Sequence, residues 1–165
     1  MVRTLVGCGA LAALVLSLAA CGTSQASSSA EQDMQRKADM WDIDQLEKNF
    51  HQATTHHDID LMMRLYAPNA TLVFASNTAV GKEQIRKFWL EKSKSFKVNW
   101  ISDTAAYKVK ITVNGDRGTL FFECHYVHPK TGKVVSVTGA DLDVARIDGR
   151  WLITNLTGAS ATLKA

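Results

Sequence analysis

The sequence predicts an α+β fold, a cone in which three N-terminal helices cover one face of a curved antiparallel sheet of about four or five strands. Between about Met40 and Ser93, apolar residues recur mainly at helical spacing. Beyond Lys97 apolar and polar residues alternate, as in residues 107–113. Helices followed by strands that turn back on one another indicate an α+β plan, and the sequence contains no internal repeat.

Three helices are expected ahead of the sheet. The first begins near Met40. Its apolar stripe consists of Ile43, Leu46, Phe50 and Ala53. The dipeptide His56-His57 interrupts this helix, and Asp58 is a favourable N-cap for a second one, which ends before Pro68. The third helix is expected over residues 82–93, with Ile85, Phe88 and Trp89 on its buried face.

Turn residues divide the rest of the chain into strands. A short apolar strand is expected over residues 71–75, ahead of the third helix. Asn114-Gly115 and the stretch from Pro129 to Gly132 separate the next strands. Asp148-Gly149 predicts a two-residue hairpin turn, because both central residues of such a turn need positive φ angles.

The N-terminus resembles a bacterial export signal. Arg3 precedes an uncharged run over residues 5–18, which is too short to span a bilayer as a helix. Leu18-Ala19-Ala20-Cys21 resembles a lipobox, so residues 1–20 are interpreted as a lipoprotein signal peptide and Cys21 as the lipidated first residue. We therefore expect a location in the bacterial cell envelope, with the chain anchored by lipid on the extracytoplasmic side of the membrane.

Small polar residues dominate the segment that follows, so residues 21–38 are expected to form a flexible tether and residues 39–165 the folded domain. Removal of the signal peptide would leave Cys124 as the single free thiol, so no disulfide is expected within the domain. The formal charge of the whole chain is +3, and neither this balance nor export favours a nucleic-acid partner.

Four segments, in this order, carry a family resemblance: His57-Asp58-Ile59-Asp60, Leu65-Tyr66-Ala67-Pro68-Asn69-Ala70-Thr71, Gly81-Lys82-Glu83-Gln84-Ile85 and Ile147-Asp148-Gly149-Arg150-Trp151. With them, residues 40–156 resemble the SnoaL-like division of the nuclear-transport-factor-2-like superfamily. The resemblance implies a cone whose helices and concave sheet enclose an apolar cavity. It implies no particular reaction, because the superfamily includes isomerases, cyclases, dehydratases and members without catalysis.

The ketosteroid isomerase branch of that superfamily uses three side chains that can be matched to this sequence. The aspartate that hydrogen-bonds the oxyanion there corresponds to Asp143, counted back from the Asp148-Gly149 turn. Its partner tyrosine corresponds to Phe50, and the general-base aspartate corresponds to Phe74. Because two of the three roles lack a suitable side chain, the resemblance does not imply steroid isomerisation by that mechanism.

A candidate pocket follows from the resemblance and from strand alternation. Tyr126 is expected on the concave face together with Asp143, and these two residues are the candidate catalytic pair. The candidate ligand-binding residues are Phe50, Tyr66, Phe74, Trp89, Trp100 and Asp141. A carboxyl group in such an apolar wall could donate a hydrogen bond or act as a general base, because burial raises its pKa. Alternatively, Asp143 is a structural acid that pairs with Tyr126 or the backbone.

Three functions agree with this pattern. The first is binding of a small apolar molecule of unknown identity in the cone cavity. The second is cofactor-free isomerase, cyclase or dehydratase chemistry by Asp143 and Tyr126. The third is a non-catalytic dimeric assembly scaffold, because Phe121, Leu142 and Val144 are expected on the convex face, where a second copy would cover them and form a homodimer.

No metal site and no cofactor are expected. His125 and His128 point to opposite faces of a strand, and His56 is adjacent to His57, so neither pair is arranged as two ligands on one element. These histidines and His51 are interpreted as solvated residues at turns and helix ends.

Overall fold

The structure, a computed structural model, describes residues 21–163, with side chains from residue 28 onward. The predicted signal peptide and the side chain of Cys21 lie outside this described part. Within it, no helix has both the length and the apolar character needed to cross a bilayer. Of the described residues, those from Met34 onward form one compact unit, which contains the sheet and all the side chains of the candidate site.

The helices follow the predicted order. They are α1 (Cys21–His56), α2 (Ile59–Leu65), α3 (Gly81–Glu91) and the short 3-10 helices η1 (Lys94–Phe96) and η2 (Ala106–Lys108). Asp58 caps α2, as predicted, and its carboxylate accepts a hydrogen bond of 2.8 Å from the backbone N–H of Leu61. His57 takes a positive φ of 54°, which ends α1 and lets the chain turn into α2.

The start of α1 differs from the expectation. The sequence predicted a flexible tether over residues 21–38, but these residues belong to the helix that runs from Cys21 to His56. Residues 30–38 contain alanine, glutamate, glutamine, methionine, arginine and lysine, all of which have high helix propensity. Composition alone indicated that the segment cannot bury a core, and this does not prevent it from forming a helix.

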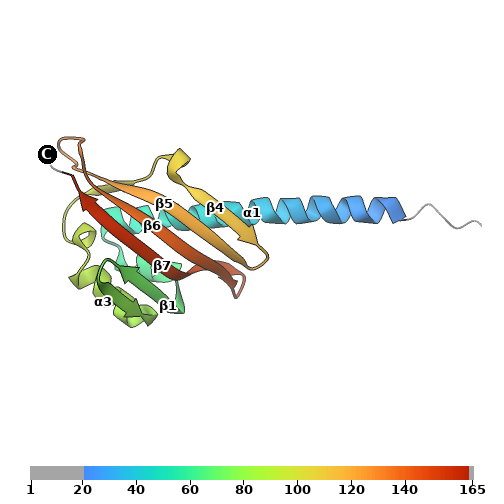
Figure 1. Ribbon diagram of the computed structural model, residues 1–165, viewed down its shortest axis with the longest axis horizontal. Coiled ribbons are helices and arrows are strands. Elements are labelled where there is room, and N and C mark those ends of the chain that lie inside the picture. Colours follow the sequence, from blue (N-terminus) through green and yellow to red (C-terminus); the bar gives the residue numbers. More distant parts are fainter. Residues whose placement is uncertain (1–20, 164–165) are drawn as a thin grey trace, which may run out of the picture. The chain divides into compact units, whose positions relative to one another are not determined.

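The sheet is larger than predicted. Its strands are β1 (Tyr66–Phe74), β2 (Asn77–Val80), β3 (Ile101–Asp103), β4 (Lys110–Asn114), β5 (Arg117–Val127), β6 (Val134–Ile147) and β7 (Arg150–Thr162). Their order is β2-β1-β7-β6-β5-β3, and β4 also pairs with β5 (Figure 1). The prediction of a purely antiparallel sheet was wrong, because β1 pairs in parallel with β7. Local sequence patterns indicate where a strand lies but not which strand will be its neighbour.

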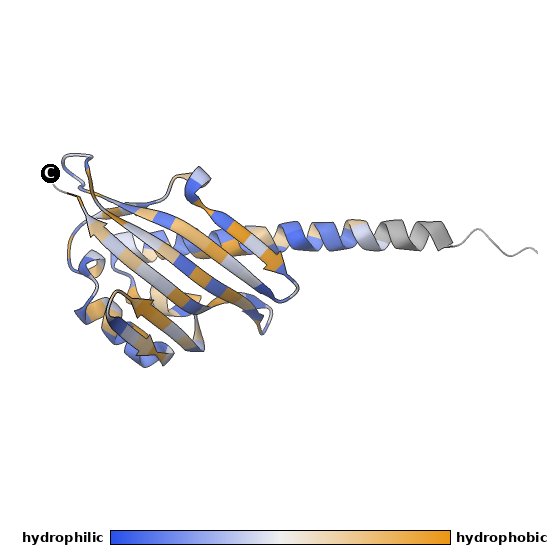
Figure 2. Cartoon of the chain, viewed as in Figure 1, coloured by the Kyte–Doolittle hydropathy of each residue, from blue (hydrophilic) through white to orange (hydrophobic). Residues whose placement is uncertain are grey.

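One face of β5 is buried, and it carries Leu120, Phe122 and Cys124 together with Tyr126, which was predicted to lie on the inner face. Colouring by hydropathy shows the alternation of apolar and polar residues along the long strands (Figure 2). Phe122 lies opposite Ala140 in the antiparallel pair, and Leu120 lies opposite Leu142. Because opposed residues share a face, Ala140 and Leu142 of β6 also point into the core.

The predicted face of Asp141 and Asp143 was therefore wrong. Both are exposed on the outer surface of the sheet, where Asp143 lies opposite Thr119. Leu142 and Val144 take the inner face and are each 2% exposed. The apolar side chains need the helix-covered face, so the carboxylates are left in water, where they are better solvated. The Asp148-Gly149 turn locates these residues along the strand but does not determine their face.

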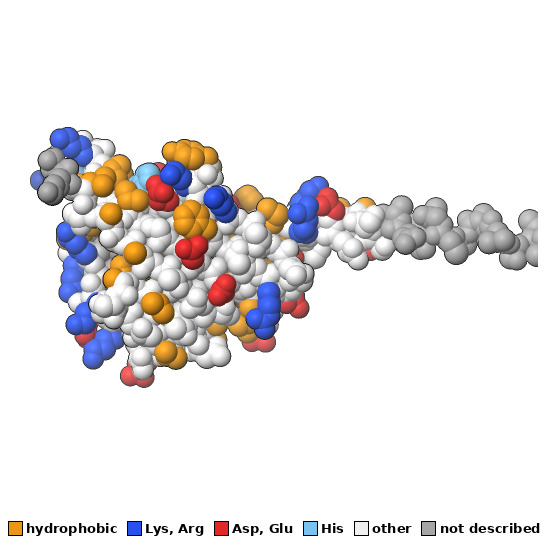
Figure 3. Space-filling model, viewed as in Figure 1, with side chains coloured by type: hydrophobic (Ala, Val, Ile, Leu, Met, Phe, Trp, Pro, Cys, Tyr) orange, Lys and Arg blue, Asp and Glu red, His pale blue; other side chains and the backbone are white. Residues whose placement is uncertain are grey.

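This result also changes the predicted dimer surface. Of the three convex-face residues proposed to meet a second copy, Leu142 and Val144 are buried inside the chain, and Phe121 alone remains on the outer face. Apolar side chains on the face shown in Figure 3 are scattered, with acidic side chains among them. Homodimer formation stays a prediction, without the apolar patch that suggested it.

The Asp148-Gly149 turn forms as predicted. The two residues have φ angles of 50° and 75°, and Ile147 pairs with Arg150 across the turn. This register places Arg146 opposite Trp151, and the guanidinium lies 5.0 Å from the centre of the indole ring. Trp151 is only 5% exposed, so its ring belongs to the core and not to a surface patch.

Candidate functional site

An apolar cavity of about 240 Å³ lies inside the cone between the helices and the inner face of the sheet. It is lined by Phe50 of α1, Phe74 of β1, Phe88 and Trp89 of α3, Trp100, and residues of β5, β6 and β7 that include Phe122, Cys124, Tyr126, Ser136, Thr138, Ala140, Leu156, Ser160 and Thr162. The long strands supply the floor, and α1 and α3 supply the opposite wall. This mixture of aromatic surface and a few hydroxyl groups is typical of a small-molecule site.

Most of the predicted ligand-binding residues line this cavity. Five of the predicted site residues do so, namely Phe50, Phe74, Trp89, Trp100 and Tyr126. Phe50 packs edge-on against Trp89 and Phe122, with ring centres 5.4 and 5.2 Å apart. Trp100 lies against Tyr126 with ring centres 5.6 Å apart. The aromatic wall is thus held together by its own ring contacts.

The remaining predicted residues are elsewhere. Tyr66 is fully buried in the core and does not line the cavity, while Asp141 and Asp143 lie on the outer face of the sheet. Tyr126 and Asp143 therefore point to opposite faces and do not form a catalytic pair. The carboxylate of Asp143 instead accepts a hydrogen bond of 3.4 Å from the side-chain amide of Asn155.

Two lysines mark the mouth of the cavity. Lys92 and Lys94 both line it and are exposed, and the Lys94 Nζ lies 5.0 Å from the centre of the Trp100 ring. Figure 3 shows Lys and Arg side chains gathered along the end of the molecule where α3 lies. Among the described residues that line the cavity there is no Asp or Glu. The mouth is therefore positively charged, which favours ligands with an anionic group.

Hydrogen-bond donors are available in or beside the cavity. The buried indole N–H of Trp89 and the buried hydroxyl of Tyr66 have no hydrogen-bond partner among the described residues other than a weak contact with one another. Burial raises the pKa of Tyr126 well above its usual value, and the neighbouring Cys124 raises it further, so this phenol stays protonated. A ligand that reaches the Tyr126 hydroxyl could accept a hydrogen bond from it.

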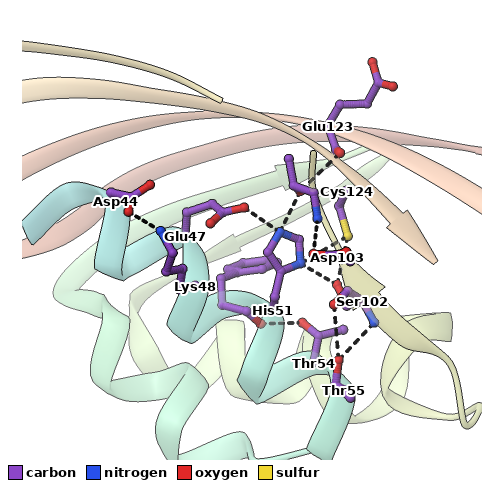
Figure 4. A network of polar contacts seen from close by, with 12 residues as sticks. Asp44, Glu47, Lys48, His51, Thr54, Thr55, Ser102, Asp103, Glu123 and Cys124 are labelled. Carbon is purple, nitrogen blue, oxygen red and sulfur yellow. Dashed lines mark hydrogen bonds and ion pairs between the residues drawn. The ribbon is translucent and has the colours of Figure 1, made fainter. Parts of the chain in front are cut away.

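A chain of polar side chains runs from the cavity wall into the layer between α1 and the sheet (Figure 4). The Cys124 Sγ lies 3.0 Å from the Ser102 Oγ, which lies 2.6 Å from the His51 Nδ1. On the other side of the imidazole, Nε2 lies 2.8 Å from the Glu47 Oε1 and 2.7 Å from the Thr104 Oγ1. All five residues are buried or half-buried, so water does not compete strongly for these contacts.

Local structure explains how these residues meet. Glu47 and His51 are four residues apart on α1 and therefore lie on one face of the helix. Ser102 is held beside them because its backbone N–H donates to the Thr55 Oγ1 at 2.9 Å. β3 pairs with β5, and in this pairing Ser102 lies opposite Tyr126. Tyr126 is two residues from Cys124 on β5, so Ser102 and Cys124 are on the same face of the sheet.

The charge on His51 depends on these neighbours. Burial lowers the pKa of His51, but the hydrogen bonds and charges of Cys124 and Glu47 outweigh this effect and raise the pKa to about 9. An imidazolium on His51 is therefore favoured once the Cys124 thiol has given up its proton, because the thiolate and the Glu47 carboxylate both stabilise the positive charge. Beyond Glu47, a shallow depression also lined by Asp44, Lys48, Asp103 and Thr104 borders the same imidazole from outside.

Comparison with known proteins gives the family. A family model described as a SnoaL-like domain matches residues 48–153, more than half of the chain. The chain belongs to the SnoaL-like domain family. The matched segment includes most of the cavity wall, from Phe50 on α1 to Ala140 on β6. No curated protein matches the chain.

Solved structures confirm the cone fold of this SnoaL-like domain. A protein of unknown function with a cystatin-like fold from Nostoc punctiforme is 17% identical, with a TM-score of 0.64 over 73% of this chain and 90% of the other. A nuclear-transport-factor-2-like protein of unknown function from Pseudomonas putida is 16% identical, with a TM-score of 0.64 over 74% and 87% of the two chains. A putative ketosteroid isomerase from Shewanella frigidimarina is 16% identical, with a TM-score of 0.57 over 69% and 91%. At such identities the likeness establishes the fold and not the activity.

Sequence reasoning missed the polar chain of the SnoaL-like domain. It interpreted His51 as a solvated residue near a helix end, whereas the side chain is buried, with 8% of the residue exposed. A signal was present, because Glu47 and His51 have helical spacing and His51 follows Phe50 of the apolar stripe. Ser102 had no such signal, because its position depends on the pairing of the three-residue strand β3 with β5.

Proposed function

We propose that this SnoaL-like domain binds a small, mainly apolar molecule with an anionic group in its cone cavity. The observation that carries the proposal is the cavity of about 240 Å³, which has aromatic walls and two lysines at its mouth. Aromatic walls offer flat apolar area to a ring system, and the charges of Lys92 and Lys94 complement a carboxylate or sulfonate. The Tyr126 hydroxyl is a polar group of the cavity wall that would orient the ligand.

Binding is favoured over the catalytic alternatives based on Asp143 and Tyr126. Asp143 is exposed on the outer face of the sheet, whereas Tyr126 is buried on the inner face. Phe50 and Phe74, which correspond to the tyrosine and the general base of the ketosteroid isomerase branch, line the cavity without supplying a titratable group. A role as an assembly scaffold has no support from an apolar outer patch, because Leu142 and Val144 are buried.

Filling the cavity should abolish binding of a suitable probe. Ala140 lines the cavity and is 2% exposed, so Ala140→Leu places a larger side chain where the ligand would lie. We expect wild type to bind 2-naphthoate more tightly than uncharged 2-naphthol, and Ala140→Leu to weaken naphthoate binding by at least about tenfold, as measured by calorimetry. The half-buried Ala145 lies on the outer face of the same strand, so Ala145→Leu is the matched control and should bind as wild type does.

Two outcomes would count against this proposal. Equal naphthoate affinity in wild type and Ala140→Leu would mean that the ligand does not occupy the cavity. Equal affinity for naphthoate and naphthol would leave the cavity as the site but remove the role of Lys92 and Lys94. Thermal unfolding of each variant is measured first, to test whether the domain stays folded with the larger side chain.

We also propose that the domain is held at the extracytoplasmic face of a bacterial membrane by lipid on Cys21. The support is the sequence Leu18-Ala19-Ala20-Cys21 alone. Cys21→Ser should release the protein from the membrane fraction of a bacterial host, whereas Cys8→Ser, which changes a cysteine inside the predicted signal, should leave it bound. Membrane retention of Cys21→Ser, measured by fractionation and immunoblotting, would contradict lipid anchoring.

A further inference from the structure

Cys124 combines two properties. Its side chain is fully buried in the protein, and it forms part of the wall of the cavity. It is also the end of the chain of side chains that runs through Ser102 and His51 to Glu47. The thiol therefore has the ligand space on one side and a hydrogen-bonded acid–base group on the other.

The donors and acceptors along this chain can be arranged in one direction. The Thr104 hydroxyl donates to the backbone carbonyl of Glu123 at 3.2 Å, so its oxygen is free to accept from the His51 Nε2–H. The same N–H faces the Glu47 carboxylate, so before any proton transfer from Cys124 the Nδ1 of His51 is an acceptor. Ser102 can then donate to Nδ1 and accept from the Cys124 thiol.

This arrangement has the three parts of an activated nucleophile, namely a nucleophile, a base and an acid that orients the base. The Cys124 Sγ also lies 3.7 Å from the His51 Nδ1, so direct proton transfer needs only a small movement of either side chain. Burying a charged glutamate or histidine costs free energy unless an opposite charge lies beside it, and Glu47 and His51 provide this for one another. The other nitrogen of the His51 ring faces the Cys124 thiol. The other charged groups that border His51 are Asp44 and Lys48 on its own helix α1 and Asp103 at the end of β3.

We propose that Cys124 is a reactive thiol that adds to an α,β-unsaturated carbonyl compound bound in the cavity. The S–H bond breaks and the proton passes through Ser102 to His51, while Sγ bonds to the β-carbon of the ligand and the double-bond electrons move to the carbonyl oxygen. Return of the proton to the α-carbon completes the addition, without a leaving group, oxidant or cofactor. This inference rests on the proposed function only in requiring that a small molecule enters the cavity.

N-ethylmaleimide is a direct probe, because it is itself an α,β-unsaturated carbonyl compound. The full-length protein is labelled under pseudo-first-order conditions, and the modified fraction is measured by mass spectrometry after trypsin digestion. Cleavage after Arg117 and Lys130 releases residues 118–130, which contain Cys124 and no other cysteine. Cys8 and Cys21 therefore do not contribute to the signal, and Cys124→Ser provides the blank.

Variants of the neighbouring residues distinguish chemical activation of the Cys124 thiol from simple access of the reagent to it. At pH 7 we expect wild type to react about tenfold faster than His51→Gln or Ser102→Ala, with Glu47→Gln in between. The matched control is His125→Gln, because His125 is adjacent to Cys124 on β5, points to the opposite face and also pairs with a glutamate, Glu123, at 2.9 Å. This control should react within about twofold of wild type.

The pH profile gives a test that needs no variant. The rate for an unassisted thiol rises nearly tenfold per pH unit below its pKa of about 8.5, whereas the rate for wild-type Cys124 should change less than about threefold from pH 6 to 8. A wild-type profile that follows the unassisted slope would overturn the proposal. Equal rates in wild type and a folded His51→Gln or Ser102→Ala protein would also overturn it.

Failure of this inference can be distinguished from failure of the proposed function. If 2-naphthoate binds and slows labelling but the rate does not depend on His51, the cavity is a binding site and the thiol is not activated. If naphthoate does not bind but labelling still depends on His51, the thiol is activated and the proposed ligand class is wrong. A folded wild type whose Cys124 is not labelled at any pH would overturn the inference outright.

Discussion

Gly118→Ala should lower the free energy of unfolding by about 3 kcal/mol. Gly118 lies on β5, where a Cβ atom would come within 2.5 Å of the backbone carbonyl oxygen of Thr112 and 3.2 Å of both Ile43 and Val144. The first contact involves the backbone of the neighbouring strand β4, which cannot move aside as a flexible side chain can. The extra methyl group must therefore displace β4 or separate the sheet from α1.

Chemical denaturation of wild type and variant measures this effect. The matched control is Gly139→Ala on β6, where the nearest atom to an added Cβ is 4.0 Å away, on the ring of Phe121. Both changes lower the entropy of the unfolded chain in the same way, so their difference isolates the steric term. Similar stabilities for the two variants would show that the sheet adapts to the methyl group at Gly118.

Asp39→Ala should destabilise the domain by a similar amount, about 3 kcal/mol. Asp39 is 3% exposed on α1, and its carboxylate accepts hydrogen bonds from Arg146 at 2.5 Å and from the Trp151 indole at 3.4 Å. The substitution leaves the Arg146 guanidinium and the Trp151 N–H without their buried partner. It also removes the hydrogen bonds that connect the hairpin of β6 and β7 to α1. By contrast Asp60, paired with Arg86 at the surface, is 70% exposed, so Asp60→Ala should change stability by no more than about 0.5 kcal/mol.

The contribution of Asp39 should depend on pH. Burial tends to raise its pKa, but hydrogen bonds from Gln35, Arg146 and Trp151 outweigh this effect, so its pKa lies below the ordinary value of 3.8. A carboxyl group with a depressed folded-state pKa stabilises the protein above its unfolded-state pKa and loses this contribution as pH falls through the folded-state pKa. The difference in unfolding free energy between wild type and Asp39→Asn should thus be largest near pH 7 and shrink below about pH 4. A constant difference from pH 7 to pH 2 would contradict the ionic role.

Some local features could be predicted because short-range chemistry decides them. Asp58 caps α2, and Asp148 with Gly149 makes a two-residue turn, because each needs only the conformational preferences of a few neighbouring residues. The aromatic wall was predictable for a related reason. Phe50 belongs to the apolar stripe of α1 and Trp89 to that of α3, and large apolar side chains on such stripes are buried in almost any packing of the two helices.

The sequence by itself therefore determined the fold class, the order of the helices and the aromatic character of the cavity wall. Only the tertiary structure decided which face of β6 carries Asp141 and Asp143, that β1 pairs in parallel with β7, and that His51 meets Ser102 and Cys124. The physical reason is the range of the interactions. Periodicity shows that alternate residues share a face, but register between distant strands and the packing of α1 on the sheet determine which face is buried and which side chains meet there.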